Sequence, residues 1–405
     1  MKRVLLRKRN DRGGGILMRY LKGTVIVFAV ILLTACAPDF SSPDEVIDET
    51  LPEDIGQETA IIPNYRVSES EYQVLLPYRL SQSRGVTTNQ VANRFDITAL
   101  ENDLRRHSTS VFDPETHFFQ EGQQIDQNEL YSWLERESES TELGLNPSAD
   151  IDADAETDEI IEIERENPRY LSHILEQNYL IRTEDNSVKL AGISIGIAMK
   201  SNYRFQTEIG GPFYYEDISD DQMLTEATTI AEEIVSRLRA KEGLQEIPIM
   251  MAVYQEAPRD GLVPGNFVVK TTVQGGSQTV GNWEAIDEEY VLFPSQRGRN
   301  VDSNLSSIID EFKSEIEGYF PNFVGVIGEG FYKDGELHRL TIEIPIEFYG
   351  QAEVTGFTQY VYGLLMNSFQ THYDLEVNIK SNERQESLLV REAGEEDLYV
   401  HIYHR

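Results

Sequence analysis

The sequence predicts an α+β fold of mainly antiparallel sheets with helices packed on one face, after a disordered N-terminal leader and tether. Apolar stretches rich in β-branched residues recur through the second half of the chain, as at residues 249–254. Single amphipathic segments with helical spacing separate them, and residues 219–243 are the clearest of these. The dipeptide Asp334-Gly335 lies between two predicted strands and is a strong hairpin signal. Runs of strands interrupted by single helices are typical of this fold class.

The chain is strongly acidic. Its 405 residues include 35 Lys and Arg against 70 Asp and Glu, which gives a formal net charge of −35. A protein that binds nucleic acid needs a basic face, so we expect no nucleic-acid partner. Cys36 is the only cysteine. Stability must therefore come from packed cores rather than from disulfides within the chain.

The start of the chain has the layout of a lipoprotein export signal. Basic residues precede an apolar run at 24–33, and a small pair then leads into Cys36. The run is shorter than the about 20 residues that span a bilayer comfortably. The cysteine thiol is the one strong nucleophile for S-acylation, so we predict that Cys36 is diacylated and begins the mature protein. The lipoprotein signal peptidase would recognise the residues before it, Leu33, Thr34 and Ala35.

The alternative is an ordinary signal peptide or anchor helix with an incidental cysteine. With two acyl chains, Cys36 would hold the protein stably at the extracytoplasmic face of the cell membrane. The expected partners are then the membrane, through this lipid, and the lipoprotein-processing enzymes. Residues 18–22 already form a complete basic region, so we predict that Met18 is the true start.

Changes in composition divide the chain. Two segments are dense in acidic residues and read as solvated connections. In the second, alternating aspartates at 150–154 resemble a calcium loop, but Ala155 and Ile161 occupy the positions that need Gly and Glu, so we predict no metal there. The predicted parts are a signal peptide (1–35), an acidic tether (36–60), a small N-terminal unit (61–137), an acidic linker (138–166) and an α+β domain (167–405).

Within the N-terminal unit we predict a strand at 72–76 and helices at 96–107 and 128–135. The α+β domain begins with a predicted helix at 170–180, because Leu171, Ile174 and Leu175 have helical spacing. A strand at 190–199 follows. The next helix starts at a capping box of Ser219 and Gln222. Further predicted strands are 249–254, 267–273 and 290–293.

The last part of the chain repeats this order. A helix at 305–319 precedes strands at 323–331 and 337–344, which the predicted hairpin joins. A helix at 356–371 and strands at 375–379, 387–390 and 398–403 complete the chain. Both halves therefore run strand, helix, strand, strand. This order suggests a weak internal duplication, although no residue pattern repeats.

The residues show no catalytic constellation, so we expect a non-enzymatic protein without cofactor or metal. The seven histidines are scattered, and the glycine-rich segment 325–330 lacks the spacing of a dinucleotide fingerprint. A binding module is the alternative function, with Tyr214 and Tyr215 rimming a groove for a peptide, glycan or cell-wall fragment. A hydrolase would require a cleft holding two carboxylates with displaced pKa values.

Several segments resemble the CamS sex-pheromone lipoprotein family of Gram-positive bacteria. They run through most of the chain after the leader and are specific in residue pattern. Besides the lipobox, the resembling segments are 76–79 and 83–85, 142–147, 170–180, 192–199 and 263–267.

The resemblance implies that the discarded leader can be trimmed to a short hydrophobic peptide that induces plasmid conjugation. It implies no catalytic residues. The corresponding segment here lacks the aromatic residue that the family's known peptide carries in its middle. Its seven residues are Ala29, Val30, Ile31, Leu32, Leu33, Thr34 and Ala35.

Overall fold

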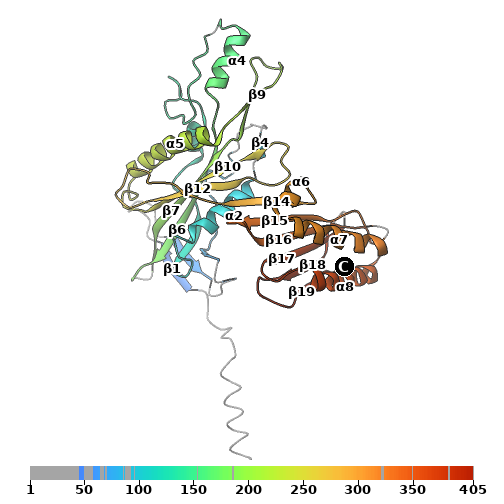
Figure 1. The fold of residues 1–405 in the computed structure, drawn as a ribbon. Coiled ribbons are helices and arrows are strands. Elements are labelled where there is room, and N and C mark those ends of the chain that lie inside the picture. Colours follow the sequence, from blue (N-terminus) through green and yellow to red (C-terminus); the bar gives the residue numbers. More distant parts are fainter. Residues whose placement is uncertain are drawn as a thin grey trace, which may run out of the picture. The chain divides into compact units, whose positions relative to one another are not determined.

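The structure is a computed structural model. It describes residues 45–404 apart from gaps at 50–57, 64–67, 69–70, 85, 87–92, 95, 153, 185–186, 321–322, 349 and 382–383. Nearly all of the described residues belong to one compact unit, Val46–Arg405. Most strand pairs are antiparallel and helices alternate with them, which confirms the predicted α+β class (Figure 1).

The first sheet is the larger of two main sheets. Its strand order is β13-β12-β10-β7-β6-β5-β3, and β1 (Glu45–Glu49) pairs with both β7 and β2 (Glu58–Ile62). Strands on both sides of the predicted acidic linker thus share one sheet. The strands of the main path are β3 (Gln73–Val74), β5 (His117–Glu121), β6 (Leu171–Arg182), β7 (Ser187–Met199), β10 (Ile249–Gln255), β12 (Asn266–Val273) and β13 (Glu284–Ala285).

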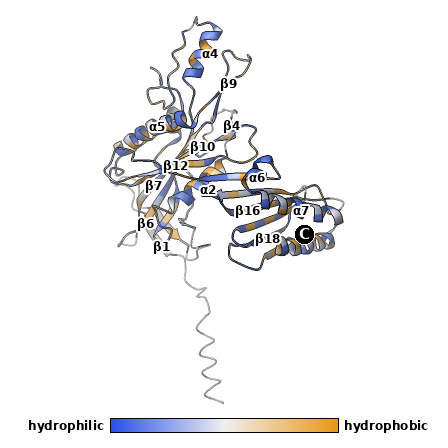
Figure 2. Ribbon diagram, in the orientation of Figure 1, coloured by the Kyte–Doolittle hydropathy of each residue, from blue (hydrophilic) through white to orange (hydrophobic). Residues whose placement is uncertain are grey.

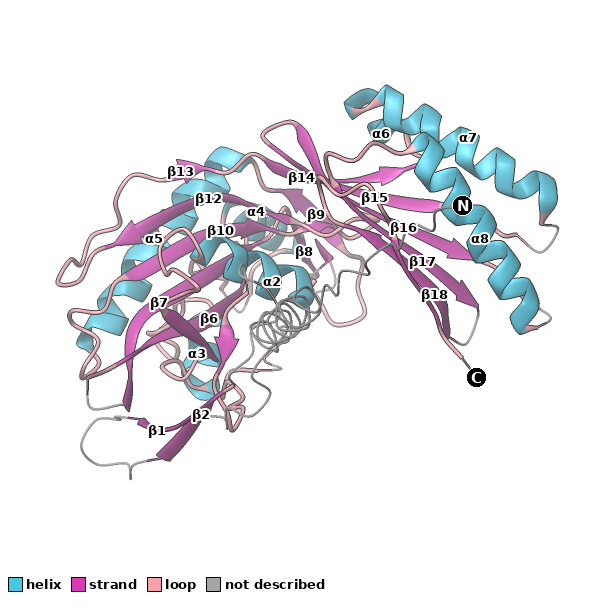
Figure 3. Cartoon of the chain, turned by 90° about the horizontal axis from the view of Figure 1, so that it is seen from below, coloured by secondary structure: helices cyan, strands magenta, loops and turns pink. Residues whose placement is uncertain are grey.

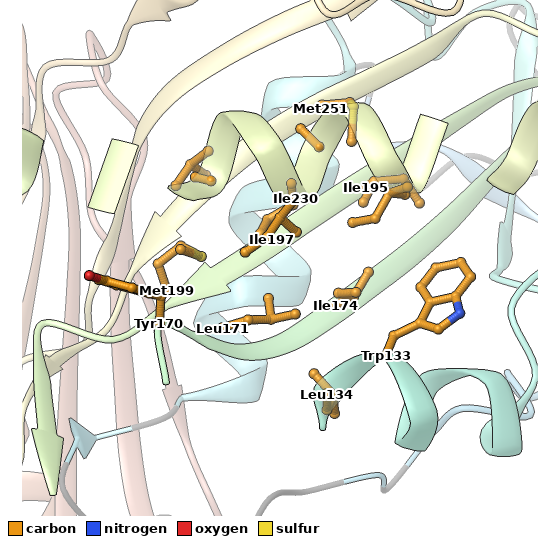
Figure 4. Close-up of a cluster of buried hydrophobic side chains, with 14 of the residues drawn as sticks. Trp133, Leu134, Tyr170, Leu171, Ile174, Ile195, Ile197, Met199, Ile230 and Met251 are labelled. Atoms are coloured by element: carbon orange, nitrogen blue, oxygen red, sulfur yellow. The ribbon is translucent and has the colours of Figure 1, made fainter. Parts of the chain in front are cut away.

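Helices cover both faces of this sheet. Helix α5 (Asp220–Ala240) packs on one face and α2 (Ile97–Ser108) on the other (Figure 1). Side chains along β10 alternate between the two resulting cores: Met251 lies in the core under α5, and Met250 lies in the core under α2. The core under α5 is shown in Figure 4, where Ile195, Ile197 and Ile230 lie among other apolar side chains.

The segment 170–180, predicted as a helix, instead forms most of strand β6. The register shifts between Leu171 and His173, so Ser172 is an extra residue on β6. This bulge places Leu171 and Ile174 on the same face although they are three residues apart, which imitates helical spacing. Leu175 belongs to the opposite face, and both faces are buried. The helix prediction was therefore wrong because the bulge and the double burial concealed the period of two.

The second sheet has the order β14-β15-β16-β17-β18-β19. Its helices α7 (Ser303–Tyr319) and α8 (Gln351–Ser368) run side by side along one face, and α6 (Gln296–Val301) precedes them (Figure 3). The predicted hairpin is confirmed at Asp334 and Gly335, both of which have positive φ. The strands are β14 (Glu288–Phe293), β15 (Ile327–Lys333), β16 (Glu336–Pro345), β17 (Asp374–Ser381), β18 (Arg384–Arg391) and β19 (Tyr399–Ile402).

The two sheets share a chain path. In the first, the antiparallel pair β6 and β7 is followed by α5, then β10 parallel to β7, then β12 and β13. In the second, the antiparallel pair β15 and β16 is followed by α8, then β17 parallel to β16, then β18 and β19. The correspondence extends over five strands and one crossover helix.

Smaller elements complete the described chain. Helix α3 (Gln127–Leu134) lies where it was predicted, and α5 begins at the predicted capping box of Ser219 and Gln222. Helix α4 (Thr157–Glu166) was not predicted; it lies within the predicted acidic linker and packs Ile161 against the core under α5. The short pairs are β4 (Asn93–Arg94) with β11 (Ala257–Pro258) and β8 (Asn202–Phe205) with β9 (Tyr214–Asp217).

Hydrophobic residues gather in the central strands, β10 and β12 among them (Figure 2). Within the described residues, none of the helices combines the length and hydropathy that a bilayer crossing needs.

Candidate functional site

The predicted lipidation site lies outside the described residues. This applies to Cys36, to the peptidase recognition residues before it and to the peptide segment 29–35. The site described below was therefore found from the structure of the body alone.

A pocket of about 470 Å³ opens on the α2 face of the first sheet, and we call it the α2 pocket. Its volume is within the range of small-molecule sites, roughly 300–1,000 Å³. Its walls come from the segment 78–86, from α2, from β5 and from β6. The lining residues are Tyr78, Ser81, Ser83, Arg84, Val86, Ile97, Thr98, Glu101, Arg105, Phe119, Glu121, His173, Leu175, Glu176 and Gln177.

Glu121 on β5 holds Tyr78, Ser81 and Arg84 at one wall of the pocket. The Tyr78 hydroxyl donates to Glu121 Oε1 at 2.5 Å, and the Ser81 backbone N–H donates to Oε2 at 2.6 Å. Arg84 forms an ion pair with the same carboxylate. Three groups from one segment thus converge on a single acceptor. The segment is positioned by charge-assisted hydrogen bonds, which are stronger than neutral ones.

Helix α2 supplies the opposite wall, with residues one helical turn apart. Ile97, Glu101 and Arg105 follow one another at intervals of four and therefore share a face of the helix. Burial raises the pKa of Glu101, and the positive charge of Arg84 opposes this shift. The Arg105 guanidinium lies 5.4 Å from the centre of the Phe119 ring. The pocket is therefore lined by carboxylates and two guanidinium groups beside apolar side chains.

Strand β6 forms the floor. His173 and Gln177 pair with Ala198 and Ser194 of β7, positions on the α2 face of the sheet. Burial lowers the pKa of His173 to about 4, so its imidazole is neutral at pH 7. The Gln177 amide donates to the Glu101 carbonyl oxygen at 2.8 Å and fixes β6 against α2. At His173 and Gln177 the floor is therefore polar but uncharged.

Glu176 has a structural role at the edge of this pocket. It pairs with Ile195, a residue of the core under α5, so its position is on the other face of β6. Its carboxylate accepts backbone N–H groups from residues 123 and 124 at 3.0 Å and from Ile125 at 2.8 Å. Burial raises its pKa to about 7, while these amides lower it. Both oxygens are therefore committed to holding the turn before α3.

The structure brings together two of the segments that carried the family resemblance. Residues from 76–79 and 83–85 line one wall of the α2 pocket, and residues from 170–180 form its floor. Sequence reasoning missed this site because it assigned 170–180 to a helix. The signal that was present is the alternation of His173, Leu175 and Gln177 on one face of a strand.

The aromatic segment 210–215 does not contribute to the α2 pocket. The Tyr214 ring stacks on Phe205, with centroids 5.5 Å apart, and Tyr214 packs against the core under α5. The Arg204 guanidinium lies 4.2 Å from the centre of the Phe213 ring. Tyr215 is 48% exposed. The predicted groove rim is therefore a partly packed hairpin end rather than a wall of the pocket described here.

A second polar cluster lies inside the first sheet. Ser172 donates to the Glu256 carboxylate, and the Lys200 ammonium interacts with the same carboxylate. Burial lowers the pKa of Lys200 and raises that of Glu256. All three residues are less than 10% exposed, so a substrate has no access to them. Among the described residues no group of three or more His, Cys, Asp or Glu could hold a metal ion.

Known proteins that resemble this chain include sex pheromone precursors. A family model described as the CamS sex pheromone cAM373 precursor matches residues 78–397. The crystal structure of a sex pheromone precursor from Lactobacillus salivarius subsp. salivarius UCC118 is similar, with a TM-score of 0.77 and 29% identity over 84% of this chain and 98% of that one.

A second solved structure is the C-terminal domain of the sex pheromone staph-cAM373 precursor from Staphylococcus aureus. Its TM-score is 0.66 at 28% identity, covering 78% of this chain and 98% of that one. No curated protein was found to match the chain.

Proposed function

The chain belongs to the CamS sex pheromone cAM373 precursor family, and from this membership we propose that it is made as a lipoprotein precursor. Signal peptidase cleaves before Cys36, and the diacylated cysteine moors the body at the extracytoplasmic face of the membrane. The observation that carries the proposal is the order basic residues, apolar run, small pair and sole cysteine at residues 19–36.

The cleaved leader is the proposed source of a peptide signal. Residues 29–35 form a heptapeptide without charged side chains, from Ala29 to Ala35. Such a peptide can partition through membranes and bind an apolar receptor pocket, because no side-chain charge has to be desolvated. The family description supports this role for a leader, and conjugation is the process that such a peptide would induce.

Mass spectrometry of the N-terminus of protein extracted from its native membrane tests the anchor and the cleavage site together. We expect a mature chain that begins at Cys36 and carries a diacylglyceryl group. Inhibition of the lipoprotein signal peptidase with globomycin should retain a larger precursor, and Cys36→Ser should abolish the lipid. A free thiol at Cys36 in protein released to the medium would contradict the proposal. The precursor mass also distinguishes a start at Met18 from one at Met1.

For the mature body we propose a non-enzymatic binding role at the α2 pocket. Its size, its apolar Ile97, Phe119 and Leu175, and its charged Glu101 and Arg105 suit a ligand with both apolar and polar parts. A peptide or a peptide-bearing glycan fragment has this composition. The pocket thus supports the extracytoplasmic binding module that was the alternative reading of the sequence.

A hydrolase is the second candidate, because Glu101 and Glu176 both border the pocket and both have raised pKa values. The contacts of Glu176 argue against it. Its two oxygens accept backbone N–H groups, and its residue is 2% exposed. A general acid needs access to the reacting atoms. We therefore favour binding over catalysis.

Binding can be tested by the thermal unfolding of the full chain in detergent with a disaccharide–tetrapeptide from the cell wall as the probe. A ligand at 100 times its Kd stabilises the folded state by about 2.7 kcal/mol. We expect Thr98→Trp, which fills the pocket, to abolish the shift, and Tyr215→Ala to leave it intact. If the wild type hydrolyses the probe and Glu101→Gln does not, the hydrolase would be favoured over the binding module.

A further inference from the structure

A second cavity, of about 380 Å³, has a mainly basic lining, although the chain as a whole is acidic. The chain has two acidic residues for every basic one. Here four lysines and arginines meet a single carboxylate, with three histidines beside them. We call this cavity the basic pocket. Its charged and titratable lining consists of Arg106, Lys270, Lys333, Arg339, His107, His338, His372 and Asp374.

Three of these cations form no ion pair with any carboxylate that the structure describes. Within the part of the chain that the structure describes, no ion pair involves Lys270, Lys333 or Arg339. Arg106 differs, because both of its terminal nitrogens bond to Glu288 at 2.7 Å. The Asp374 carboxylate accepts the Ala393 backbone N–H at 2.8 Å. Three positive charges therefore face one engaged negative charge.

Two of the three unpaired cations, Arg339 and Lys270, are oriented by groups that do not neutralise them. The guanidinium groups of Arg106 and Arg339 lie 4.8 and 5.5 Å from the centre of the Phe331 ring. The Lys270 ammonium donates to the Ser110 hydroxyl at 3.3 Å. Cation–π contact and a neutral hydroxyl orient a positive charge without cancelling it. The positive field of the pocket is therefore available to a ligand.

We propose that the basic pocket binds a small soluble anion that carries phosphate groups. Two or three adjacent phosphates match the number of uncompensated cations, and arginine suits phosphate oxygens because its donors form a planar fork. A long polyanion is excluded, since the net charge of −35 repels it outside the pocket. The cavity volume fits a ligand of the size of a pyrophosphate ester.

Isothermal titration of the full chain in non-ionic detergent with inorganic pyrophosphate tests this proposal. We expect saturable binding that weakens as the salt concentration rises. Arg339→Gln and Lys333→Gln should each weaken binding about tenfold, since each removes charge-assisted hydrogen bonds. Asp374→Asn should tighten binding, because it removes the one lining carboxylate and keeps the acceptor for Ala393. The matched control is Arg259→Gln, an exposed arginine elsewhere, which should change nothing.

A parallel titration uses glycerophosphoglycerol, the soluble form of a phospholipid headgroup. Weaker binding than pyrophosphate supports a free phosphate ligand, whereas tighter binding overturns that assignment in favour of a lipid headgroup. Circular dichroism checks that the variants are folded, which we expect because Lys333 and Arg339 are exposed. Absence of binding at millimolar pyrophosphate, or equal binding by wild type and Arg339→Gln, would overturn the proposal. The result is independent of the lipid anchor and of the α2 pocket.

Discussion

In the first sheet helices cover both faces, whereas in the second α7 and α8 lie along one face. Burial along the central strands follows this difference. All of Met250, Met251 and Ala252 in β10 are buried, but in β17 the buried Leu375 and Val377 alternate with partly buried Glu376 and Asn378. The same chain path therefore produces two kinds of interior.

The difference extends to polar residues. The buried positions of β16 and β17 are all apolar, whereas β6 buries His173, Glu176 and Asn178. A buried polar group costs stability unless it is hydrogen-bonded. The first sheet retains such groups beside the α2 pocket, whereas the second buries its polar side chains in β14 and β18, at Glu288, Glu386, Ser387 and Arg391. The two sheets therefore differ in which strands hold their buried His, Glu and Arg side chains: β6 of the main path in the first, and β14 and β18 in the second.

The largest expected effects come from truncating one core residue in each sheet. Ile195 in β7 and Ile342 in β16 are both fully buried. Either change to Ala should destabilise its sheet by about 2–5 kcal/mol, through lost burial and the cavity that remains. Because the apolar clusters are separate, hydrogen exchange read by mass spectrometry should rise mainly in the substituted sheet. An equal rise in both sheets would show that they unfold as one unit.

The next effect concerns Glu288 on β14, which is bonded to Arg106 and His107. Burial would raise its pKa, but these two partners lower it from 4.5 to about 2. A lowered folded-state pKa stabilises the protein above pH 4.5, and this contribution is lost as the pH falls to about 2. It amounts to about 3 kcal/mol. Urea unfolding between pH 5 and pH 2 should show this loss in wild type and a flatter profile in Glu288→Gln.

The ionisation of Glu176 in the first sheet should change the stability with pH in the opposite direction. Its folded-state pKa is raised to about 7, so its contribution to stability falls as the pH rises from 4.5 to 7. Glu176→Gln should remove the loss of stability between pH 4.5 and pH 7. It should leave unchanged the loss of stability below pH 4.5 that is due to Glu288. A Glu176→Gln variant with the wild-type profile over pH 4.5–7 would contradict the comparison. Glu289→Gln, which removes only an exposed ion pair with Arg297, is the control for both carboxylates.

A smaller effect should follow from Glu121→Gln at the α2 pocket. The change removes the ion pair with Arg84 and weakens the hydrogen bonds from Tyr78 and Ser81. We expect a destabilisation of about 1–2 kcal/mol, with faster hydrogen exchange confined to residues 78–86. Lys380→Gln breaks the exposed pair with Glu343 in the second sheet and should cost less. An equal cost for the two variants would remove the distinction between the sheets.

The smallest effect belongs to the hairpin of the second sheet. Gly335 has a φ of +76°, a conformation that costs residues with a Cβ about 1 kcal/mol. Gly335→Ala should lower the stability by about that amount in denaturant titration. Gly356→Ala in α8 is the matched control, because nothing lies near its added Cβ. That substitution should raise stability by up to about 1 kcal/mol, since Ala favours helix over Gly.

The second sheet was more predictable from sequence than the first. In the second sheet, helix α7 and the hairpin at Asp334-Gly335 follow from local signals. In the first sheet the capping box that starts α5 is such a signal. Strand β6 was not predictable by pattern, because two buried faces and a bulge at Ser172 remove the alternation. The α2 pocket was missed for the same reason: its floor depends on β6, and Glu121 contacts a segment about 40 residues away.

The two strands that end the main path of the first sheet, β3 and β13, are only two residues long. A strand of two residues offers few free amide and carbonyl groups to the backbone of a neighbouring copy. Because β13 pairs only with Val269 and Lys270 of the eight-residue β12, it protects only that part of the sheet edge from strand addition.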